Sequence, residues 1–411
     1  MDLRVCVIGL GYIGLPTASL LATKGFRVLG VDINPDVVSK INAGGIHIVE
    51  PGLDILVKSA IHSENLRASL TPDCADVFII AVPTPFDEHK QPDVAYIAAA
   101  ANAIAPHLKN DDLIILESTS PVGTTQKIQS QLLKLRPDLT ALSFAYCPER
   151  VIPGKVLQEL IENDRIVGGL DAQSTQRAVD FYKSFVGGKV LETTARVAEM
   201  CKLTENAFRD VNIAFANELS MICEALKMDV WELIRLANHH PRVHILQPGP
   251  GVGGHCIAVD PWFIVSQTPE HAKLIKTARE VNDAKPDWVI QKIKHAAKKF
   301  VKPVIACLGL SFKANIGDLR QSPAKYIVEK LIQDQVGEIL VCEPHLEKSD
   351  YFQLTTLSDA IERADMVVIL VDHLDFKKLS MVDLSEKIVI DTKGILLSHK
   401  MAATNVEFIH A

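Results

Sequence analysis

The stretch Leu3-Arg-Val-Cys-Val-Ile8-Gly9-Leu-Gly11-Tyr-Ile-Gly14 places an apolar, β-branched run directly before three glycines in the pattern Gly-x-Gly-x-x-Gly. The next residues, 15–24, predict a helix, and residues 27–31 predict a second strand that ends at Asp32. A strand, a glycine turn, a helix and an acid 18 residues after Gly14 are together typical of a dinucleotide-binding βαβ unit. The alternative interpretation is a glycine-rich turn that binds no cofactor.

Each glycine of the turn has a distinct expected task. Gly9 makes the tight turn, Gly11 lets a pyrophosphate approach the helix N-terminus, and Gly14 lets the helix pack on the strand. Asp32 would hold the ribose hydroxyls and repel a 2′-phosphate, so the pattern favours NAD over NADP. The predicted cofactor contacts in this region are Gly9, Gly11, Tyr12, Ile13, Gly14 and Asp32.

Loops that follow further apolar runs carry polar side chains. Residues 75–82 and 113–116 predict buried strands, and ligands bind at the carboxyl ends of such strands in an open α/β sheet. The predicted cofactor contacts in the two loops are Thr84, Thr119 and Thr125, and ordinary turn or helix-cap threonines are the alternative. The next strand ends at Glu149, which could act as a base, bind water or pair with Arg150.

From about residue 197 the sequence pattern becomes typical of helices. Residues 199–226 contain no Gly or Pro and predict one long helix, on which Lys202, Asn206 and Arg209 share a face. This face could contact a ligand, and the alternative is a solvated polar stripe. Shorter helices are expected over residues 230–237, 272–284 and 288–300.

A glycine-rich loop, Gly249-Pro-Gly-Val-Gly-Gly-His-Cys256-Ile-Ala-Val-Asp260, presents a cysteine between these helices. Glycines allow a ligand to approach the backbone closely, so Cys256 is a candidate nucleophile if a nearby cation or base favours its thiolate. A buried structural cysteine is the alternative. His239 and His240 stand together before a proline and lack helical ligand spacing, so no metal site is expected.

A second α/β pattern begins at Pro303, with strands expected at residues 304–310, 339–342, 365–371 and 388–391. Its first loop lacks the dinucleotide glycines but offers Lys313 and Arg320 before a helix, which suits a phosphate-bearing ligand other than a second NAD. The predicted fold class is α/β, with two Rossmann-like domains, 1–192 and 301–411, flanking a helical domain, 193–300.

Composition limits the classes of partner. The 411 residues are 48% hydrophobic and 23% charged, with a formal charge of −7 and no basic stripe, which argues against nucleic acid or an anionic membrane as partner. The longest apolar runs are only strand-sized, and the first strand begins at once, so neither a membrane span nor a signal peptide is expected. Eight scattered cysteines without a C-x-x-C pair indicate a reduced, cytoplasmic protein.

Over essentially its whole length the chain resembles the UDP-sugar 6-dehydrogenases. The matching motifs are Gly9-x-Gly-x-x-Gly14, Glu50-Pro-Gly-Leu53, Pro83-Thr-Pro85, Ser118-Thr-x-Pro-Val-Gly123, Lys202-x-x-x-Asn206, Gly253-Gly-x-Cys256-x-x-x-Asp260 and Phe312-Lys313. Residues 46–51, 81–86, 145–150 and 240–262 are most similar to family members that oxidise UDP-N-acetyl-D-mannosamine, and UDP-N-acetyl-D-glucosamine is the alternative UDP-N-acetyl-hexosamine substrate. Ala258-Val259 stands where UDP-glucose enzymes carry Pro-Lys.

The resemblance implies a four-electron oxidation with two NAD per turnover, in which Cys256 forms a thiohemiacetal and then a thioester. Lys202 and Asn206 would stabilise the oxyanion, Lys202 could take the alcohol proton, Glu149 would orient the hydrolytic water and Asp260 the cysteine loop. The residues implied to line the UDP-sugar site are Arg150, Val151, Lys202, Asn206, Arg209, His240, Arg242, Gly253, Phe312 and Lys313, with Arg320 facing the cofactor.

The resemblance also implies a homodimer assembled through the long helix, and a role in surface polysaccharide synthesis. Two other functions compete. A two-electron β-hydroxyacid dehydrogenase of the 6-phosphogluconate type shares the first domain and an essential lysine but needs no cysteine and no second α/β domain. An NAD-dependent sensor or scaffold would leave Cys256 and the Lys202 face unexplained.

Overall fold

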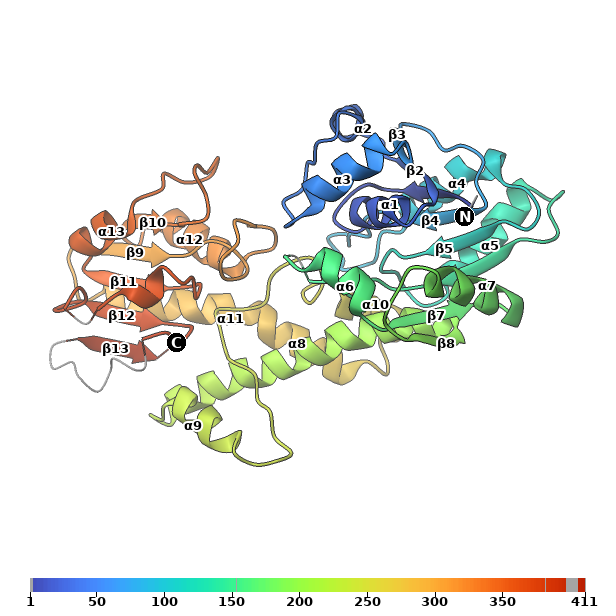
Figure 1. The fold of residues 1–411 in the computed structure, drawn as a ribbon. Coiled ribbons are helices and arrows are strands. Elements are labelled where there is room, and N and C mark those ends of the chain that lie inside the picture. The colour runs from blue at the N-terminus through green and yellow to red at the C-terminus, as the bar shows by residue number, and fades with distance from the viewer. Residues whose placement is uncertain (1–2, 153, 381, 397–405, 411) are drawn as a thin grey trace. The chain divides into compact units, whose positions relative to one another are not determined.

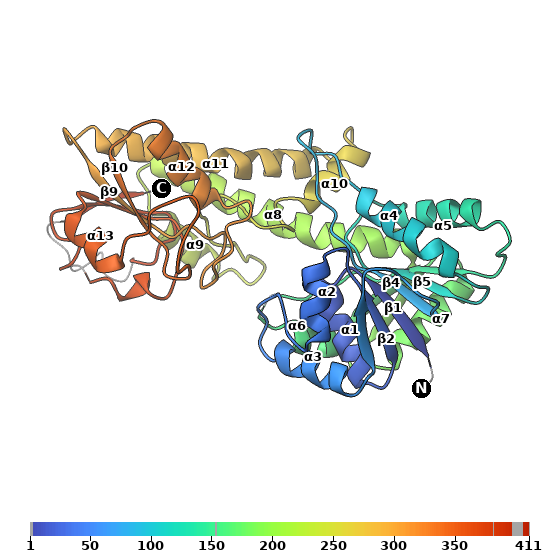
Figure 2. The ribbon, with the colours of Figure 1, turned by 90° about the horizontal axis from the view of Figure 1, so that it is seen from above.

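The computed structural model describes residues 3–152, 154–380, 382–396 and 406–410. The chain divides into two compact units, which Figures 1 and 2 show in two views. The N-terminal unit comprises residues 1–205 and 262–267, and the C-terminal unit comprises residues 206–261 and 268–411. The expected domain boundaries after residues 192 and 300 stay a prediction.

An eight-stranded sheet in the order β3-β2-β1-β4-β5-β6-β7-β8 forms the centre of the N-terminal unit. Its strands are β1 (Arg4–Ile8), β2 (Arg27–Val31), β3 (Leu66–Ser69), β4 (Val77–Ile80), β5 (Leu113–Leu116), β6 (Ser143–Tyr146), β7 (Arg165–Gly169) and β8 (Val190–Thr194). Neighbouring strands are parallel except β6 and β7, which pair antiparallel. The order reverses next to β1, as in a doubly wound dinucleotide fold.

Helices cover both faces of this sheet (Figures 1 and 2). They are α1 (Gly14–Thr23), α2 (Pro35–Asn42), α3 (Leu53–His62), α4 (Ala95–Ile104), η1 (Ala105–His107), α5 (Thr124–Leu135), α6 (Val156–Glu162) and α7 (Ala172–Lys183). Helices α1, α3, α6 and α7 contribute to one buried apolar cluster, and α4 and α5 to another. Because both faces are covered, the central strands β4 and β5 are buried along their whole length.

The long helix is α8 (Ala195–Ala225), which begins in the N-terminal unit and continues in the C-terminal unit. Helices α9 (Val230–Ala237) and α10 (Asp260–Gln267) follow. The expectation of two helices over residues 272–284 and 288–300 is wrong, because α11 (Lys273–Ala297) is a single helix through Pro286. Proline removes one helical hydrogen bond and crowds the carbonyl of residue i−4, but the buried flanking residues Lys285 and Val289 pack the helix on both sides of it.

The C-terminal unit contains a smaller, wholly parallel sheet in the order β10-β9-β11-β12-β13. Its elements are β9 (Val304–Leu308), α12 (Pro323–Gln333), β10 (Glu338–Cys342), α13 (Leu357–Arg363), β11 (Met366–Ile369), η2 (Phe376–Lys378), β12 (Ile388–Asp391) and β13 (Glu407–His410). Buried apolar clusters lie on both faces. The predicted fold class, two Rossmann-like domains with a central helical region, is confirmed.

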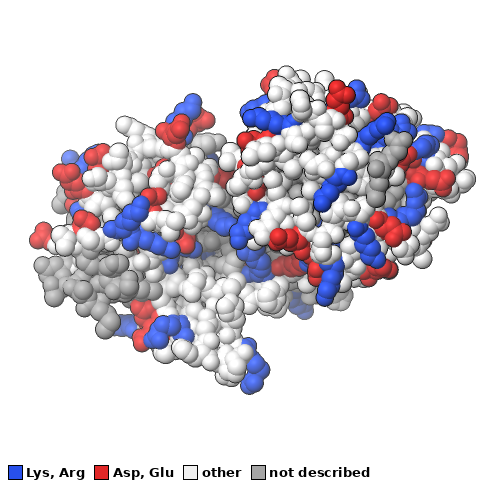
Figure 3. Space-filling model, in the orientation of Figure 1, with Lys and Arg blue, Asp and Glu red and all other residues white. Residues whose placement is uncertain are grey.

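Two surface properties bear on the expected partners. Among the described residues, no helix combines the length and the apolar character needed to cross a membrane. On the face shown in Figure 3, Lys and Arg are interspersed with Asp and Glu over both units.

Candidate active site

The glycine turn after β1 has the geometry that a dinucleotide requires. Gly9 has a φ of 94°, and a Cβ on Gly14 would lie 1.8 Å from the Gly9 carbonyl oxygen. A Cβ on Gly11 would meet no atom of the described residues within 4 Å, and no side chain caps α1 at Ile13. The first N–H groups of α1 therefore suit a pyrophosphate.

Asp32 is fixed beside this turn by its own backbone contacts. One carboxylate oxygen accepts the Leu10 N–H at 3.0 Å, and the other accepts the Asn34 N–H at 2.9 Å. The side chain is half-buried at the end of β2, where a ribose lies in this type of fold. The turn and the acid together fit NAD. Tyr12, in the same turn, is exposed.

The three threonines predicted as cofactor contacts lie in two different arrangements. The Thr84 hydroxyl donates to the Thr119 carbonyl oxygen at 2.5 Å, so the loops after β4 and β5 meet. Thr125 is buried, and its N–H and hydroxyl both donate to Glu199 Oε1, at 2.8 and 2.7 Å. Glu199 thus caps α5 from the first turns of α8, a role that the sequence did not reveal.

Glu149 is held by several groups of the N-terminal unit. Arg165 Nη1 donates to Glu149 Oε2 at 2.5 Å, and the Arg150 N–H donates to Oε1 at 2.6 Å. The Arg150 guanidinium instead pairs with Glu205 at 2.7 Å, so the side-chain partner of Glu149 is Arg165. Lys202 Nζ donates to the Glu149 carbonyl oxygen at 2.8 Å. Lys202 and Glu149, two predicted catalytic residues, therefore lie in contact.

A second buried carboxyl, Glu117, lies near this pair. It accepts the Tyr182 hydroxyl at 2.6 Å, and its other oxygen has no hydrogen-bond partner among the described residues. Burial raises the pKa of Glu117 to about 7, with Arg165 lowering it and Glu149 raising it further. The sequence alone assigned no role to Glu117.

Cys256 lies exposed in the turn that leads into α10. The N–H groups of Val259 and Asp260 donate to its carbonyl oxygen, at 3.0 and 2.8 Å. Asn206 Nδ2 donates to Asp260 Oδ2 at 2.6 Å, and both of these side chains are buried. Two predicted catalytic residues, Asn206 and Asp260, thus meet, and Asp260 is hydrogen-bonded to the backbone of the cysteine.

The cysteine loop, residues 249–259, packs against the loop after β9. A Cβ on Gly253 would lie 2.4 Å from the Gln321 carbonyl oxygen and 2.9 Å from Phe312 Cβ, so only glycine fits there. The Gly254 N–H donates to the Arg320 carbonyl oxygen at 3.3 Å. Gly253, Phe312 and Arg320, predicted from separate motifs, therefore come together. The Arg320 guanidinium pairs with Asp318 at 2.6 Å.

The remaining predicted contacts are less constrained by neighbours. Val151 is half-buried, and the exposed residues of this group are Arg209, His240, Arg242 and Lys313. The Arg242 N–H donates to His240 Nδ1 at 3.3 Å. The predicted residues divide between the two units: Glu149, Arg150, Val151 and Lys202 belong to the N-terminal unit, and the other substrate and catalytic residues belong to the C-terminal unit.

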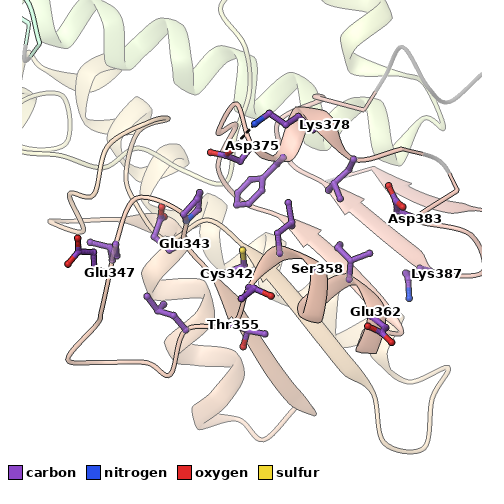
Figure 4. A pocket seen from close by; sticks show the side chains of 18 of the residues that line it. Cys342, Glu343, Glu347, Thr355, Ser358, Glu362, Asp375, Lys378, Asp383 and Lys387 are labelled. Carbon is purple, nitrogen blue, oxygen red and sulfur yellow. Dashed lines mark hydrogen bonds and ion pairs between the residues drawn. The ribbon is translucent and has the colours of Figure 1, made fainter.

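Two other features lie apart from the predicted residues. A cavity of about 1020 Å³ in the C-terminal unit, shown in Figure 4, lies between the end of β10, α13 and η2, and no predicted site residue lines it. Asp73, Cys74 and His107 place potential metal-ligand atoms within 4.8 Å of one another, and Asp73 and Cys74 are exposed. Neither feature includes a residue predicted to bind NAD, to bind the UDP-sugar or to act in catalysis.

Three domain models of the UDP-glucose/GDP-mannose dehydrogenase family match the chain. The NAD binding domain matches residues 3–186, the central domain matches residues 196–284, and the UDP binding domain matches residues 306–398. The C-terminal domain, expected to bind a phosphate-bearing ligand, is therefore of the UDP-binding type.

Curated relatives match nearly the full length. The chain is 57% identical to the NDP-N-acetyl-D-galactosaminuronic acid dehydrogenase of Ralstonia nicotianae, over 98% of this chain and 99% of that protein. It is 53% identical to the UDP-N-acetyl-D-mannosamine dehydrogenase of Escherichia coli K12, over 95% and 98%. The solved UDP-D-ManNAc dehydrogenase of Pyrococcus horikoshii is 37% identical, with a TM-score of 0.90 over 99% of each chain. The chain therefore belongs to the UDP-glucose/GDP-mannose dehydrogenase family and is an NAD-dependent enzyme of the UDP-sugar dehydrogenase type.

Proposed function

We propose that this enzyme oxidises UDP-N-acetyl-D-mannosamine to UDP-N-acetyl-D-mannosaminuronate through a covalent intermediate on Cys256. The primary alcohol and one water become a carboxylate, with loss of two hydrides and three protons. NAD, when bound, accepts one hydride in each of the two oxidation steps. The observation that carries the proposal is the 53–57% sequence identity, over nearly the full length, to enzymes named for N-acetylated sugars.

Cys256 supplies what the second oxidation needs. An aldehyde gives up hydride only after a nucleophile has made its carbon tetrahedral, and a thiolate can add and later leave. Addition of the Cys256 sulfur gives a thiohemiacetal, loss of hydride gives a thioester, and water then releases the carboxylate and the thiol. Five of the other cysteines are buried, whereas Cys256 is exposed beside the Asn206–Asp260 pair.

Four further residues support this chemistry in the proposal. Lys202 and Asn206, one turn apart on α8, would stabilise the oxyanion, and Lys202 would also take the alcohol proton. Glu149, fixed by Arg165, would orient the hydrolytic water. Asp260, fixed by Asn206, would orient the cysteine turn.

The other residues predicted from the sequence complete the proposed site. The proposed substrate contacts are Arg150, Val151, Arg209, His240, Arg242, Gly253, Phe312 and Lys313, and the proposed cofactor contacts are Gly9, Gly11, Tyr12, Ile13, Gly14, Asp32, Thr84, Thr119, Thr125 and Arg320.

A second candidate substrate is UDP-N-acetyl-D-galactosamine, because the Ralstonia relatives, 57% identical, are named for N-acetyl-D-galactosaminuronic acid. Both candidates carry the acetamido group. A site that binds this amide leaves its own polar groups unpaired with UDP-glucose, which lowers kcat/KM by about 10⁴-fold.

The substrate test is kcat/KM, at saturating NAD, for the UDP forms of N-acetylmannosamine, N-acetylgalactosamine, N-acetylglucosamine and glucose. We expect the manno sugar to give the highest value and glucose to be nearly inert. A higher value for either of the other N-acetylated sugars would replace the manno assignment and leave the cysteine chemistry standing.

We also propose a place for the reaction in the cell. The product, an acidic amino sugar nucleotide, would serve surface polysaccharide synthesis, and a gene deletion should remove mannosaminuronate from the isolated polysaccharide. The eight cysteines are scattered along the chain without a C-x-x-C pair, which favours a cytoplasmic location. Detection of the tagged protein outside the cytoplasmic fraction would contradict that location.

Assembly as a homodimer through α8 is the last part of the proposal. Phe208, Phe215 and Ile222 recur every seven residues and are 68%, 52% and 43% exposed, and Leu226 is 63% exposed. An exposed apolar stripe of this kind favours a protein partner. The expected result is a dimer, or a multiple of one, by light scattering at micromolar concentration.

A further inference from the structure

Four buried polar side chains join α8 to α11 inside the C-terminal unit. Asp210 and Asn217 come from α8, Arg279 and Asn282 come from α11, and each is at most 1% exposed. Arg279 Nη1 and Asn282 Nδ2 donate to Asp210 Oδ1, at 2.5 and 2.8 Å. Asn217 Nδ2 donates to Asn282 Oδ1 at 2.8 Å. These four residues, called here the polar network, form one continuous chain of hydrogen bonds.

The polar network contacts the cysteine loop on both sides of Cys256. At the start of the loop, the buried Gly249 N–H donates to Asn217 Oδ1 at 2.9 Å. After the cysteine, the Ile257 carbonyl oxygen lies 3.5 Å from Arg279 Nη1. The network thus supplies both a hydrogen-bond acceptor and a donor to the backbone that carries the thiol.

A single face of α8 carries the groups that anchor this loop. Asn206, Asp210 and Asn217 follow the spacing i, i+4 and i+11, so they lie in line along the helix. Asn206 holds Asp260, Asp210 holds Arg279, and Asn217 holds Gly249. The helix therefore serves as a rigid support for the whole cysteine loop.

Helix packing alone does not explain the polar network. Burial raises the pKa of Asp210, with Arg279 opposing the shift, so placing this carboxyl here has an electrostatic cost. Apolar side chains of similar volume would join two helices equally well or better. They could not satisfy the Gly249 N–H, which burial would otherwise leave unpaired at a cost of about 1–3 kcal/mol.

We infer that the polar network positions Cys256 for reaction, and that Asn217 and Arg279 are its positioning residues. The inference rests on the proposed function of Cys256. Gly251 and Gly254 have positive φ and leave the loop backbone freer than other residues would, so the direction of the thiol depends on anchors at both ends. Sulfur must reach the aldehyde carbon in one geometry, and a misplacement of about 1 Å costs on the order of 10²-fold in rate.

The test compares Asn217→Ala with Ser220→Ala in the full-length enzyme. Ser220 lies three residues later on α8, is also buried and accepts from Lys285 of α11 at 2.7 Å. Its hydroxyl donates to the Asn217 carbonyl oxygen within α8, and among the described residues it has no hydrogen bond to the cysteine loop. Both substitutions remove a polar link between the same two helices, so both should lower the Tm. Only Asn217→Ala removes an anchor of the loop.

Three readouts separate positioning from stability. For Asn217→Ala we expect kcat to fall at least 10-fold with KM for the UDP-sugar within threefold, whereas Ser220→Ala should keep kcat within twofold. Iodoacetamide labelling of Cys256, followed by peptide mass spectrometry, should change at least threefold in rate in Asn217→Ala. Cys74, which is exposed in the other unit, is the internal standard and should not change.

Either of two results would overturn the inference: kcat within twofold of wild type, or a loss of kcat without any change in Cys256 labelling relative to Cys74. If Asn217→Ala does not fold, the same criteria apply to Arg279→Lys, which keeps the charge beside Asp210 but loses the planar group directed at Ile257. Cys256→Ser is measured in parallel, because an active Cys256→Ser would refute the proposed function rather than the network.

Discussion

At the scale of single residues, we expect the substitution of Cys256 to lower turnover the most. In Cys256→Ser the fold and NAD binding should persist, because the side chain is exposed and the NAD-binding turn lies in the other unit. Turnover to the uronate should fall at least about 10³-fold, since an alkoxide forms far less readily than a thiolate near neutral pH. An NAD titration measures cofactor binding, and steady-state kinetics measures turnover. Two NADH per sugar at near wild-type rate would remove the cysteine from the mechanism.

Asp32 determines which dinucleotide is accepted. Its carboxylate is fixed by the Leu10 and Asn34 N–H groups, so Asp32→Ala removes a preset partner of the ribose. We expect KM for NAD to rise at least about 10-fold and discrimination against NADP to shrink, because the charge that repels a 2′-phosphate is lost. An unchanged NAD/NADP ratio of kcat/KM would show that Asp32 does not hold the ribose.

Glu117 should make stability depend on pH. Its folded-state pKa of about 7 lies above the ordinary 4.5, so between these values the folded protein binds more protons than the unfolded chain, and stability falls as pH rises. The free energy of unfolding falls by about 3 kcal/mol in total, and this fall is complete above pH 7. Glu117→Gln, which can still accept from Tyr182, should therefore raise the Tm at pH 8 and much less at pH 5. An equal shift of Tm at both pH values would contradict this.

The residues that sequence reasoning found and missed differ in one physical respect. Cys256, Asn206 and Asp260 have local signatures, namely a glycine run or a helical spacing. Arg165 has none, because it meets Glu149 only through the antiparallel return of β7 beside β6. Long-range pairing of that kind is not encoded in any window of sequence.

At the scale of elements, helices with continuous patterns were predicted best. The long helix was expected at residues 199–226 and is α8, Ala195–Ala225, and the helix at residues 230–237 matches α9. The prediction failed at Pro286, where tertiary packing overrides the local preference of proline. The short strands β3, β7, β8 and β13 were not recognised. The burial pattern of β8 mixes exposed and half-buried residues, so its sequence lacks a continuous apolar run.

The exposed face of α8 gives an element-scale prediction. Phe215→Glu places a charge in the apolar stripe, which a dimer interface would have to bury, so the protein should become monomeric at micromolar concentration. Ile55→Glu, on the exposed surface of α3 (70% exposed), is the matched control and should leave the assembly unchanged. Light scattering checks both, and a dimeric Phe215→Glu protein would place the interface elsewhere.

At the scale of the whole molecule, the two Rossmann-like domains repeat one structural plan. Gly9 and Gly309 have φ values of 94° and 96°, and each accompanies an acid, Asp32 or Glu343, that accepts the N–H of the following leucine. Asp76 and Asp365 are equivalent in the same way, because each accepts a strand N–H at 2.9 Å. The second domain was recognised from sequence by the α/β strand pattern that begins at Pro303.

Sequence motifs alone do not give the contacts that functional residues make inside each of the two units. Motifs predicted which residues carry the chemistry, and the structure fixes their neighbours within each unit, such as Lys202 with Glu149 and Asn206 with Asp260. The C-terminal turn has Ala314 where the N-terminal turn has Gly14, consistent with a UDP binding domain rather than a second NAD site. This second α/β domain also argues against a two-electron β-hydroxyacid dehydrogenase.

The number of NADH molecules formed per sugar tests the central claim most directly. Purified enzyme, excess NAD and a limiting, known amount of UDP-N-acetyl-D-mannosamine are taken to completion, and NADH is read by absorbance while the sugar nucleotide is identified by mass. Four-electron oxidation through Cys256 predicts two NADH per sugar and a uronate product. One NADH per sugar, with an aldehyde or ketone as the final product, would contradict it.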